Sequence, residues 1–277
     1  MPFAASPRTL KILAPARVAD IEFGKVRVDD TNYNQLLKGM QQLRGRIYLD
    51  DHAIQPQQLT KDGRHKLDSD ETSWHLLILD EAEQVCGCVR YREHPEEAGF
   101  SHLGVARSAL AQCGEWGPKL ATAVSAELAL ARRLAISYVE VGGWALKEQI
   151  RNTGEALRMV LATYSLAQAL GGGVGLSTAT RRHSSASILR KLGGRSLEER
   201  GVELPAYFDP EYGCEMEILR FYSWAPNPRY HTWVEAIREE LKTIPVVTRK
   251  LQSHVAVSRT PEVIRDGAGV CGQFALA

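Results

Sequence analysis

The strongest constraint on the fold is a stretch without any charged side chain, residues 159–180. Its first part continues a pattern of apolar residues at helical spacing. A triple glycine, 171–173, then interrupts the stretch, and Thr, Ser and Gln side chains dilute it. A membrane-spanning helix, which needs about 20 predominantly apolar residues, is therefore not expected. The pattern predicts a helix over 153–170, stopped by the glycines, and then a strand over 174–180.

The rest of the chain alternates between strand-like and helix-like segments. Period-two or β-rich runs predict strands, apolar residues at three- and four-residue spacing predict helices, and the polar segment 47–72 reads as a long surface connection. The predicted strands cover 23–28, 74–79, 85–91, 137–146, 174–180 and 214–222, and the predicted helices cover 31–44, 118–134, 153–170, 184–192 and 228–242. This order predicts an α/β (α+β) fold with a central sheet flanked by helices.

The same pattern suggests a domain organisation. Residues 1–22 show no sustained period and are expected to form an N-terminal arm, residues 23–224 the main domain, and residues 225–277 an extra C-terminal helix with an extended tail.

Composition narrows the partners and the compartment. The 277 residues include 34 Lys and Arg against 33 Asp and Glu, so the net charge of +1 creates no overall field that would attract nucleic acid. The N-terminus carries prolines and charges where a signal peptide needs a clean apolar run. We therefore expect a cytoplasmic protein with no transmembrane segment and no nucleic-acid partner.

Cysteine spacing does not indicate a metal site. The five cysteines include one C-x-C pair and no C-x-x-C, which fits neither a disulfide framework nor a zinc site. The pair, Cys86 and Cys88, lies in a predicted strand, where both sulfurs are expected on one face as small apolar groups. We expect no metal. The chain also lacks G-x-S-x-G, G-x-x-x-x-G-K-[ST] and H-E-x-x-H, which disfavours hydrolase, P-loop and zinc-protease functions.

The segment that carries most chemistry is Gln149–Ala156, where a predicted strand passes into a helix. A helix start exposes backbone N–H groups and the positive end of the helix dipole. Gly154 and Ala156 would leave those amides accessible to a pyrophosphate, and Arg151 would add a charge-assisted bond. The alternative is an ordinary capped helix, with Thr153 as the N-cap.

R-x-x-G-x-A at such a junction, after a hairpin and before another strand, resembles the GNAT acyltransferase superfamily over about residues 23–222. The resemblance implies a mixed sheet in which the strands 137–146 and 174–180 splay apart around the pantetheine arm of acyl-coenzyme A. It implies a donor that is acyl-coenzyme A or an acyl carrier protein. The cofactor-binding residues that it implies are Trp144, Ala145, Leu146, Arg151, Asn152, Thr153, Gly154, Glu155, Ala156 and His183.

A second set of residues resembles one branch of the superfamily, the autoinducer synthases and N-acyl amino acid synthases. The L-R-G-R-I-Y run with Arg44, the G-x-x-R strand with Arg90, and the strand with Glu140 match their patterns, and an acidic cluster, 68–71, is similar to theirs. Autoinducer synthases usually have arginine where this chain has Gly143. The resemblance therefore favours an N-acyl amino acid synthase over a homoserine lactone synthase.

The implied reaction is transfer of an acyl group, long-chain in the favoured branch, from a thioester to the amine of an amino acid or similar small acceptor. Glu140 is the candidate base, provided that partial burial raises its pKa, and Trp144–Leu146 amides would polarise the thioester carbonyl. Arg44 and Arg90 would bind a substrate carboxylate or a carrier phosphate. The alternatives are purely structural roles: Glu140 in a salt bridge on its strand, Arg44 and Arg90 in surface ion pairs, and His183 at a surface position at a helix start.

Three other functions fit the same residues. A homoserine lactone synthase would use S-adenosylmethionine as acceptor, a short-chain acetyltransferase would differ in the length of the donor, and a non-catalytic module would bind acyl thioesters without turnover. Donor length, acceptor identity and the choice between coenzyme A and a carrier protein are not encoded in any motif of the sequence.

Overall fold

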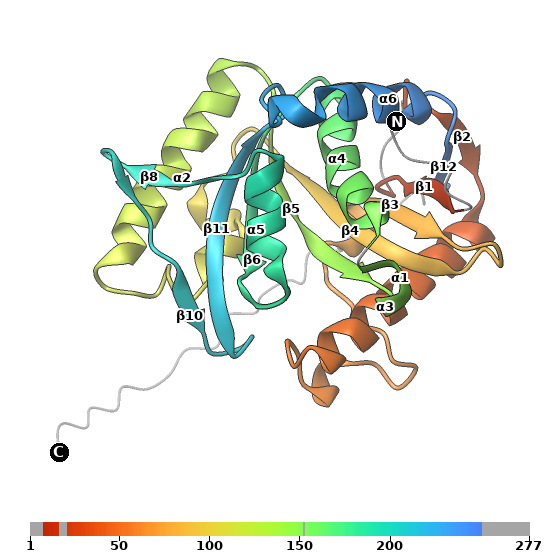
Figure 1. Ribbon diagram of the computed structural model, residues 1–277, viewed down its shortest axis with the longest axis horizontal. Coiled ribbons are helices and arrows are strands. Elements are labelled where there is room, and N and C mark those ends of the chain that lie inside the picture. The colour runs from red at the N-terminus through yellow and green to blue at the C-terminus, as the bar shows by residue number, and fades with distance from the viewer. Residues whose placement is uncertain (1–7, 17–20, 152, 251–277) are drawn as a thin grey trace, which may run out of the picture.

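The computed structural model describes residues 8–16, 21–151 and 153–250. Their main feature is one large mixed sheet with the strand order β10-β11-β6-β5-β4-β3-β1-β12-β2 (Figure 1). The strands are β1 (Thr9–Leu13), β2 (Lys25–Val28), β3 (Trp74–Leu79), β4 (Val85–His94), β5 (Ser137–Leu146), β6 (Gly173–Thr180), β10 (Tyr207–Asp209), β11 (Cys214–Tyr222) and β12 (Pro245–Thr248). A short strand, β7 (Arg195–Ser196), also pairs with β11, and β8 (Glu198–Glu199) and β9 (Val202–Glu203) form a separate hairpin.

Helices cover both faces of the sheet. The α-helices are α1 (Asp30–Asp50), α2 (Trp116–Arg133), α3 (Glu148–Arg151), α4 (Gly154–Ala169), α5 (Ser185–Leu192) and α6 (His231–Leu241). The apolar face of α1 packs on β1, β3 and β4, and that of α2 packs on β6 and β11. Helices α4, α5 and α6 cover the opposite face (Figure 1). A chain of this length thus buries three apolar clusters instead of one.

Strands β5 and β6 separate in the middle of the sheet. They pair in parallel only from Ser137 with Gly173 to Glu140 with Leu176. Beyond that point β5 stays paired with β4 as far as Leu146, while β6 stays paired with β11 as far as Thr180. The described stretches 141–146 and 177–180 therefore diverge, as the sequence resemblance implied, and the fold is GNAT-like with a splayed sheet.

Both ends of the described chain contribute inner strands, which differs from the predicted organisation. β1 lies between β3 and β12, and β12 lies between β1 and β2. The predicted boundaries after residues 22 and 224 therefore cut through one sheet, and residues 9–13 are not an arm. Strands this short do not show the alternation of apolar and polar residues from which strands are predicted, and their partners come from distant parts of the chain. Most of the predicted tail, 251–277, lies outside the described residues.

Several predicted elements have the bounds that the pattern indicated. β5 and β11 agree at both ends, and Thr153 is the N-cap of α4, its side chain accepting a hydrogen bond from the Glu155 amide. Cys86 and Cys88 both pack in apolar clusters, as predicted, but the prediction that they share one face of the strand is wrong. A register shift between β3 and β4 places Cys86 in the α4-side core and Cys88 in the α1-side core.

Candidate functional site

A β-bulge shapes β5 just beyond the point where it leaves β6. The register with β4 shifts between Cys88, which faces Ala145, and Arg90, which faces Gly142, so β5 has an extra residue there. Gly143 lies in this bulge with a φ of 66°, a conformation that favours glycine. A Cβ atom at Gly143 would lie 3.6 Å from Nη1 of Arg44 and 3.4 Å from Cβ of Arg90. The backbone here is thus shaped for glycine, not for the arginine of autoinducer synthases.

Behind the bulge lies a buried ion pair between α1 and the segment that precedes β3. The Arg44 side chain is 0% exposed and that of Asp70 is 1% exposed, with an Nη2–Oδ2 distance of 2.7 Å. Nη1 of Arg44 donates to the other Asp70 oxygen at 2.9 Å, and Nη2 also donates to the His65 carbonyl. Burial raises the pKa of Asp70, but the Arg44 guanidinium and the Leu67 amide outweigh it and hold the pKa below its usual value. Arg44 is enclosed by the protein, and its two terminal nitrogens already bind Asp70.

Arg90 faces the same side of the sheet and is more open. It is partly buried, and its Nη1 donates to the Ser69 hydroxyl at 2.9 Å, whereas its buried Nε has no hydrogen-bond partner. Among the described residues no carboxylate forms a salt bridge with it. Burial and then the positive charge of Arg44 lower the pKa of Arg90. A partly desolvated guanidinium with free donors is suited to an incoming carboxylate.

Glu140 is the last residue of β5 that pairs with β6, and hydrogen bonds fix its carboxylate. Its Oε2 lies 2.9 Å from Nε2 of His94 and accepts from the Gly104 amide at 3.0 Å, and Oε1 accepts from the Val105 amide at 3.1 Å. Burial raises its pKa, but these hydrogen bonds and the charge of His94 lower it more. The expected upward shift of the Glu140 pKa is therefore wrong. The carboxylate stays ionised near neutral pH and is a poor proton acceptor.

Arg90, His94 and Glu140 lie on the face of the sheet covered by α1 and α2, while Val139 and Val141 line the opposite face. His94 was not singled out from the sequence. The strand register could have indicated it, because His94 on β4 pairs with Tyr138, two residues before Glu140.

α4 begins at Gly154, close to the predicted helix start, with Arg151 beside it. Arg151, at the end of α3, donates to the Leu146 carbonyl and lies 3.5 Å from both carboxylate oxygens of Asp51, which follows α1. Arg182 donates to the Asp51 carbonyl at 2.8 Å. Gly154 is the first residue of the helix and has no side chain to cover the amides. Asp51 thus contacts both Arg151, which adjoins this helix N-terminus, and Arg182.

The other predicted cofactor residues fall into different surroundings. Glu155 is buried and lies 3.5 Å from Arg158, so its side chain turns into the protein. Ala156 is also buried. Asn152 lies outside the described residues, and so does the side chain of His183, whose backbone belongs to a short 3-10 turn, Arg182–Ser184.

Trp144, Ala145 and Leu146 lie on the part of β5 that has left β6. Ala145 packs in the α1-side core and Leu146 in the α4-side core, while Trp144 is partly buried with an indole N–H that has no partner. No strand of the described residues pairs with the β6-facing backbone edge of this stretch. Two carbonyls of the stretch 141–146 accept from side chains, that of Leu146 from Arg151 and that of Gly143 from the Cys88 thiol.

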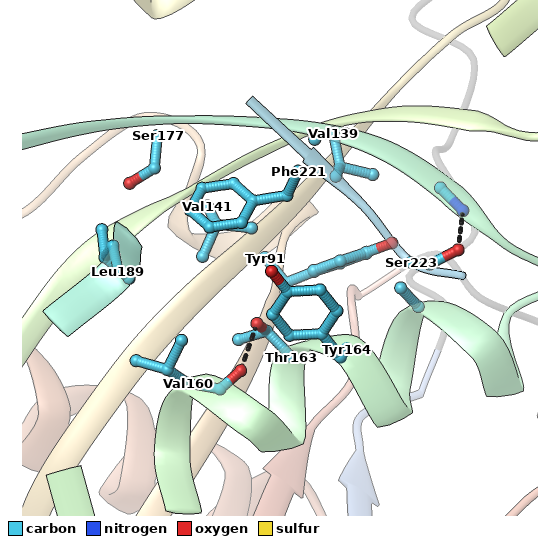
Figure 2. A pocket seen from close by; sticks show the side chains of 13 residues that line it. Tyr91, Val139, Val141, Val160, Thr163, Tyr164, Ser177, Leu189, Phe221 and Ser223 are labelled. Atoms are coloured by element: carbon cyan, nitrogen blue, oxygen red, sulfur yellow. Dashed lines mark hydrogen bonds between the residues drawn. The ribbon is translucent and has the colours of Figure 1, made fainter. Parts of the chain in front are cut away.

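A mostly apolar cavity lies between α4 and the sheet where β5 and β6 separate (Figure 2). Its walls include Val139 and Val141 from β5, Val160 from α4 and Phe221 from β11. The volume is about 30 Å³, which holds about one water molecule. An acyl group would enter only if wall side chains moved. The sequence indicated the splay but not this cavity.

Within the described part of the chain, no cluster of three His, Cys, Asp or Glu side chains could hold a metal ion. No helix in those residues is both long enough and apolar enough to span a bilayer.

The fold is shared with solved acyltransferase structures. A coenzyme A-dependent acyl-homoserine lactone synthase, BjaI, solved with SAM and isopentyl-CoA, has a TM-score of 0.51 and 13% identity, covering 88% of this chain and 93% of BjaI. FeeM, an N-acyl amino acid synthase from uncultured soil microbes, has a TM-score of 0.43 and 10% identity, covering 78% of this chain and 90% of FeeM.

An agmatine N-acetyltransferase is similar with a TM-score of 0.45 and 14% identity, over 78% of this chain and 100% of its own. No protein-family model and no curated protein matches the sequence. At these sequence identities the similarity establishes the fold alone, and the evidence for that fold is the comparison with BjaI.

Proposed function

We propose that this protein is a GNAT-type N-acyltransferase that transfers an acyl group from coenzyme A or an acyl carrier protein to the amine of an amino acid or a similar acceptor. The observation that supports this most is the divergence of β5 and β6 beyond Glu140 and Leu176. It opens the sheet between the α4 N-terminus and the polar face that carries Arg90 and Glu140. The similarity in fold to BjaI, whose structure contains SAM and isopentyl-CoA, supports the same class.

The donor would be anchored by its phosphate groups at the start of α4. Arg151 has a side chain that is 32% exposed, and its 3.5 Å contacts with Asp51 are long for charge-assisted hydrogen bonds. A pyrophosphate would replace that weak pairing with shorter bonds and would also meet the helix dipole. The pantetheine arm would then run between β5 and β6, where the unpaired edge of 141–146 can hydrogen bond to it and to the thioester carbonyl.

The acceptor would bind on the α1 and α2 side of the sheet. The guanidinium of Arg90 would take its carboxylate, and the ionised Glu140 would attract its ammonium group. Arg44 acts differently from the sequence prediction: it positions the site through Asp70 and does not itself bind the substrate.

The reaction is an aminolysis. The acceptor's ammonium loses one proton and the neutral nitrogen attacks the thioester carbon. The C–N bond forms, the C–S bond breaks, and the thiolate of the donor leaves and takes up the second proton that the nitrogen loses. We assign the proton uptake to His94. In the tautomer that donates Nε2–H to Glu140, the other ring nitrogen, Nδ1, carries the lone pair that accepts a proton.

The experiment is release of free thiol by the purified full-length chain from donors between acetyl- and palmitoyl-coenzyme A and from acyl carrier proteins. Each is mixed with amino acids, agmatine or S-adenosylmethionine. Amino-acid-dependent release supports the proposal, and release with S-adenosylmethionine alone would favour a homoserine lactone synthase. Donor binding without release in any mixture would contradict the enzyme and favour a binding module.

A thermal-shift series tests the donor site separately. A donor at about 100 times its dissociation constant stabilises the folded state by about 2.7 kcal/mol. Arg151→Ala should abolish this shift for coenzyme A itself, which has no acyl group. Arg27→Gln, on the exposed strand β2, is the matched control and should leave it unchanged.

A further inference from the structure

The cavity beside α4 extends along β5 and β6 across the point where they separate. Of the residues that line it, Val139 pairs with Gly175 in the second-last pair between the strands. Val141 and Ser177 also line it and lie just beyond the last pair. An acyl group whose thioester lies in the splay therefore has this cavity as its continuation into the protein. The inference below rests on the proposed acyl transfer, because the donor supplies the occupant.

Two tyrosines that line this cavity have hydroxyls with no hydrogen-bond partner among the described residues. Tyr91 is 1% exposed and Tyr164 is 4% exposed, and the oxygen of each is buried (Figure 2). Two other hydroxyls in the wall form hydrogen bonds within the protein. Thr163 donates to the Val160 carbonyl at 2.7 Å, and Ser223 accepts from the Gly173 amide at 3.0 Å. A buried hydroxyl without a partner costs about 1–3 kcal/mol. Other interactions must offset this cost for such a hydroxyl to stay buried in the folded protein.

The two hydroxyls lie beside different segments of the chain. The Tyr91 oxygen would be 3.1 Å from a Cβ atom on Gly173, the first residue of β6, where β5 and β6 are still paired. The Tyr164 oxygen would be 2.8 Å from a Cβ atom on Gly193, after α5. Because the splay opens at the other end of β6, only the part of an acyl group far from its thioester can reach Tyr91.

We propose that the site selects acyl groups that carry an oxygen, a hydroxyl or a carbonyl, on the part remote from the thioester, and that the Tyr91 hydroxyl binds this oxygen. Plain acyl chains of the same length leave the hydroxyl unpaired. A site built to hydrogen bond to a substrate oxygen rejects the analogue without it more strongly than an apolar pocket rejects a missing methylene.

The test compares two donors of equal chain length, octanoyl-coenzyme A and ω-hydroxyoctanoyl-coenzyme A. We expect kcat/KM for the hydroxylated donor to exceed that for the plain donor by about tenfold or more. Tyr91→Phe should remove most of that preference, because it keeps the ring and removes the hydroxyl. Equal values for the two donors in the unmodified protein, or a preference that survives Tyr91→Phe, would overturn the proposal.

Tyr33→Phe is the matched control. Tyr33 also has a buried hydroxyl without a partner among the described residues, but it belongs to α1, on the other face of the sheet. The donor preference should be unchanged in this variant. A preference lost equally in both variants would overturn the assignment to Tyr91.

A binding readout separates this proposal from the proposed function. Octanoic and ω-hydroxyoctanoic acids are added to the full chain, and the thermal midpoint is measured without any acceptor. A larger shift with the hydroxylated acid, reduced by Tyr91→Phe, supports the pocket even if no transfer is ever detected. Transfer without a difference between the two acids or the two donors would leave the acyltransferase intact and would mean that a trapped water, not an acyl oxygen, satisfies Tyr91.

Discussion

The two faces of the central sheet bury polar groups in different ways. On the α1 side, Arg44 and Asp70 form a nearly completely enclosed ion pair, and His75 donates from Nε2 to the Asp70 carbonyl at 2.7 Å. On the α4 side, the cavity wall is neutral, and its two tyrosines, Tyr91 and Tyr164, have hydroxyls without partners. The charges on the first face compensate one another within the chain, whereas the Tyr91 and Tyr164 hydroxyls on the second face, like that of Tyr33 on the first, have no partner among the described residues.

This difference distinguishes polar groups that stabilise the fold from polar groups that can bind a ligand. An enclosed ion pair is costly to break because the remaining charge loses its partner in a low-dielectric region. An unpartnered hydroxyl is costly to keep, so its removal should be tolerated. Arg90 lies between these extremes, partly buried beside the ion pair but without a carboxylate of its own among the described residues.

The largest effect should come from breaking the ion pair. Asp70→Asn leaves the Arg44 charge buried without its counter-charge, and we expect a loss of about 3–5 kcal/mol in the free energy of unfolding. Urea unfolding monitored by circular dichroism measures it. The double variant Arg44→Met, Asp70→Leu should recover much of the loss. A single-variant loss below about 1 kcal/mol would mean that the pair does not support the fold.

The next effect is acid sensitivity on the same face. Burial lowers the pKa of His75 to about 4, against an ordinary value of 6.5. Between these values the unfolded chain binds a proton that the folded chain does not, so stability falls as the pH drops from 6.5 towards 4. The contribution is on the order of 3 kcal/mol, at about 1.4 kcal/mol for each pH unit.

Urea midpoints across that pH range measure the slope. His75→Gln should flatten it partly, because His65 has a similarly lowered pKa of about 4, for which burial is again the main cause. His52→Asn, at an exposed position, is the control and should retain the full slope. An unchanged slope in His75→Gln would contradict the buried neutral state of this histidine.

A smaller effect, on activity and not on stability, is expected at Arg90. Arg90→Gln should raise KM for a carboxylate-bearing acceptor by about tenfold or more, because a hydrogen bond to a charged group contributes about 1.5–3 kcal/mol. The KM for an acceptor amide without the carboxylate should hardly change. Steady-state kinetics with both acceptors decide the matter, and an equal rise for the two would mean that Arg90 only supports the local structure.

The smallest effect is predicted for the α4 face. Tyr164→Phe removes a hydroxyl that has no partner, so the free energy of unfolding should stay within about 1 kcal/mol of the original or increase. Thermal and urea unfolding of the two proteins without ligand test this. A clear loss of stability would show that the hydroxyl is bound inside the folded protein and would remove the contrast between the two faces.

Local patterns in the sequence were sufficient for the elements with strong periods. Apolar alternation in β5 and β11, and the glycines after α4, defined those elements because strand and helix periods act over a few neighbouring residues. The R-x-x-G-x-A segment likewise indicated a capped helix start beside Arg151, since capping and the helix dipole are local effects.

Long-range packing decided the remainder. The inner positions of β1 and β12, the pairing of Arg44 with Asp70, and the hydrogen bonds that lower the pKa of Glu140 each join residues far apart in the chain. Burial and the identity of a distant partner determine whether a charged residue supports the fold or binds a ligand, and neither is present in a local pattern. The sequence by itself determined the order of elements and the candidate residues; only the tertiary structure decided which of them are enclosed and which face a cavity.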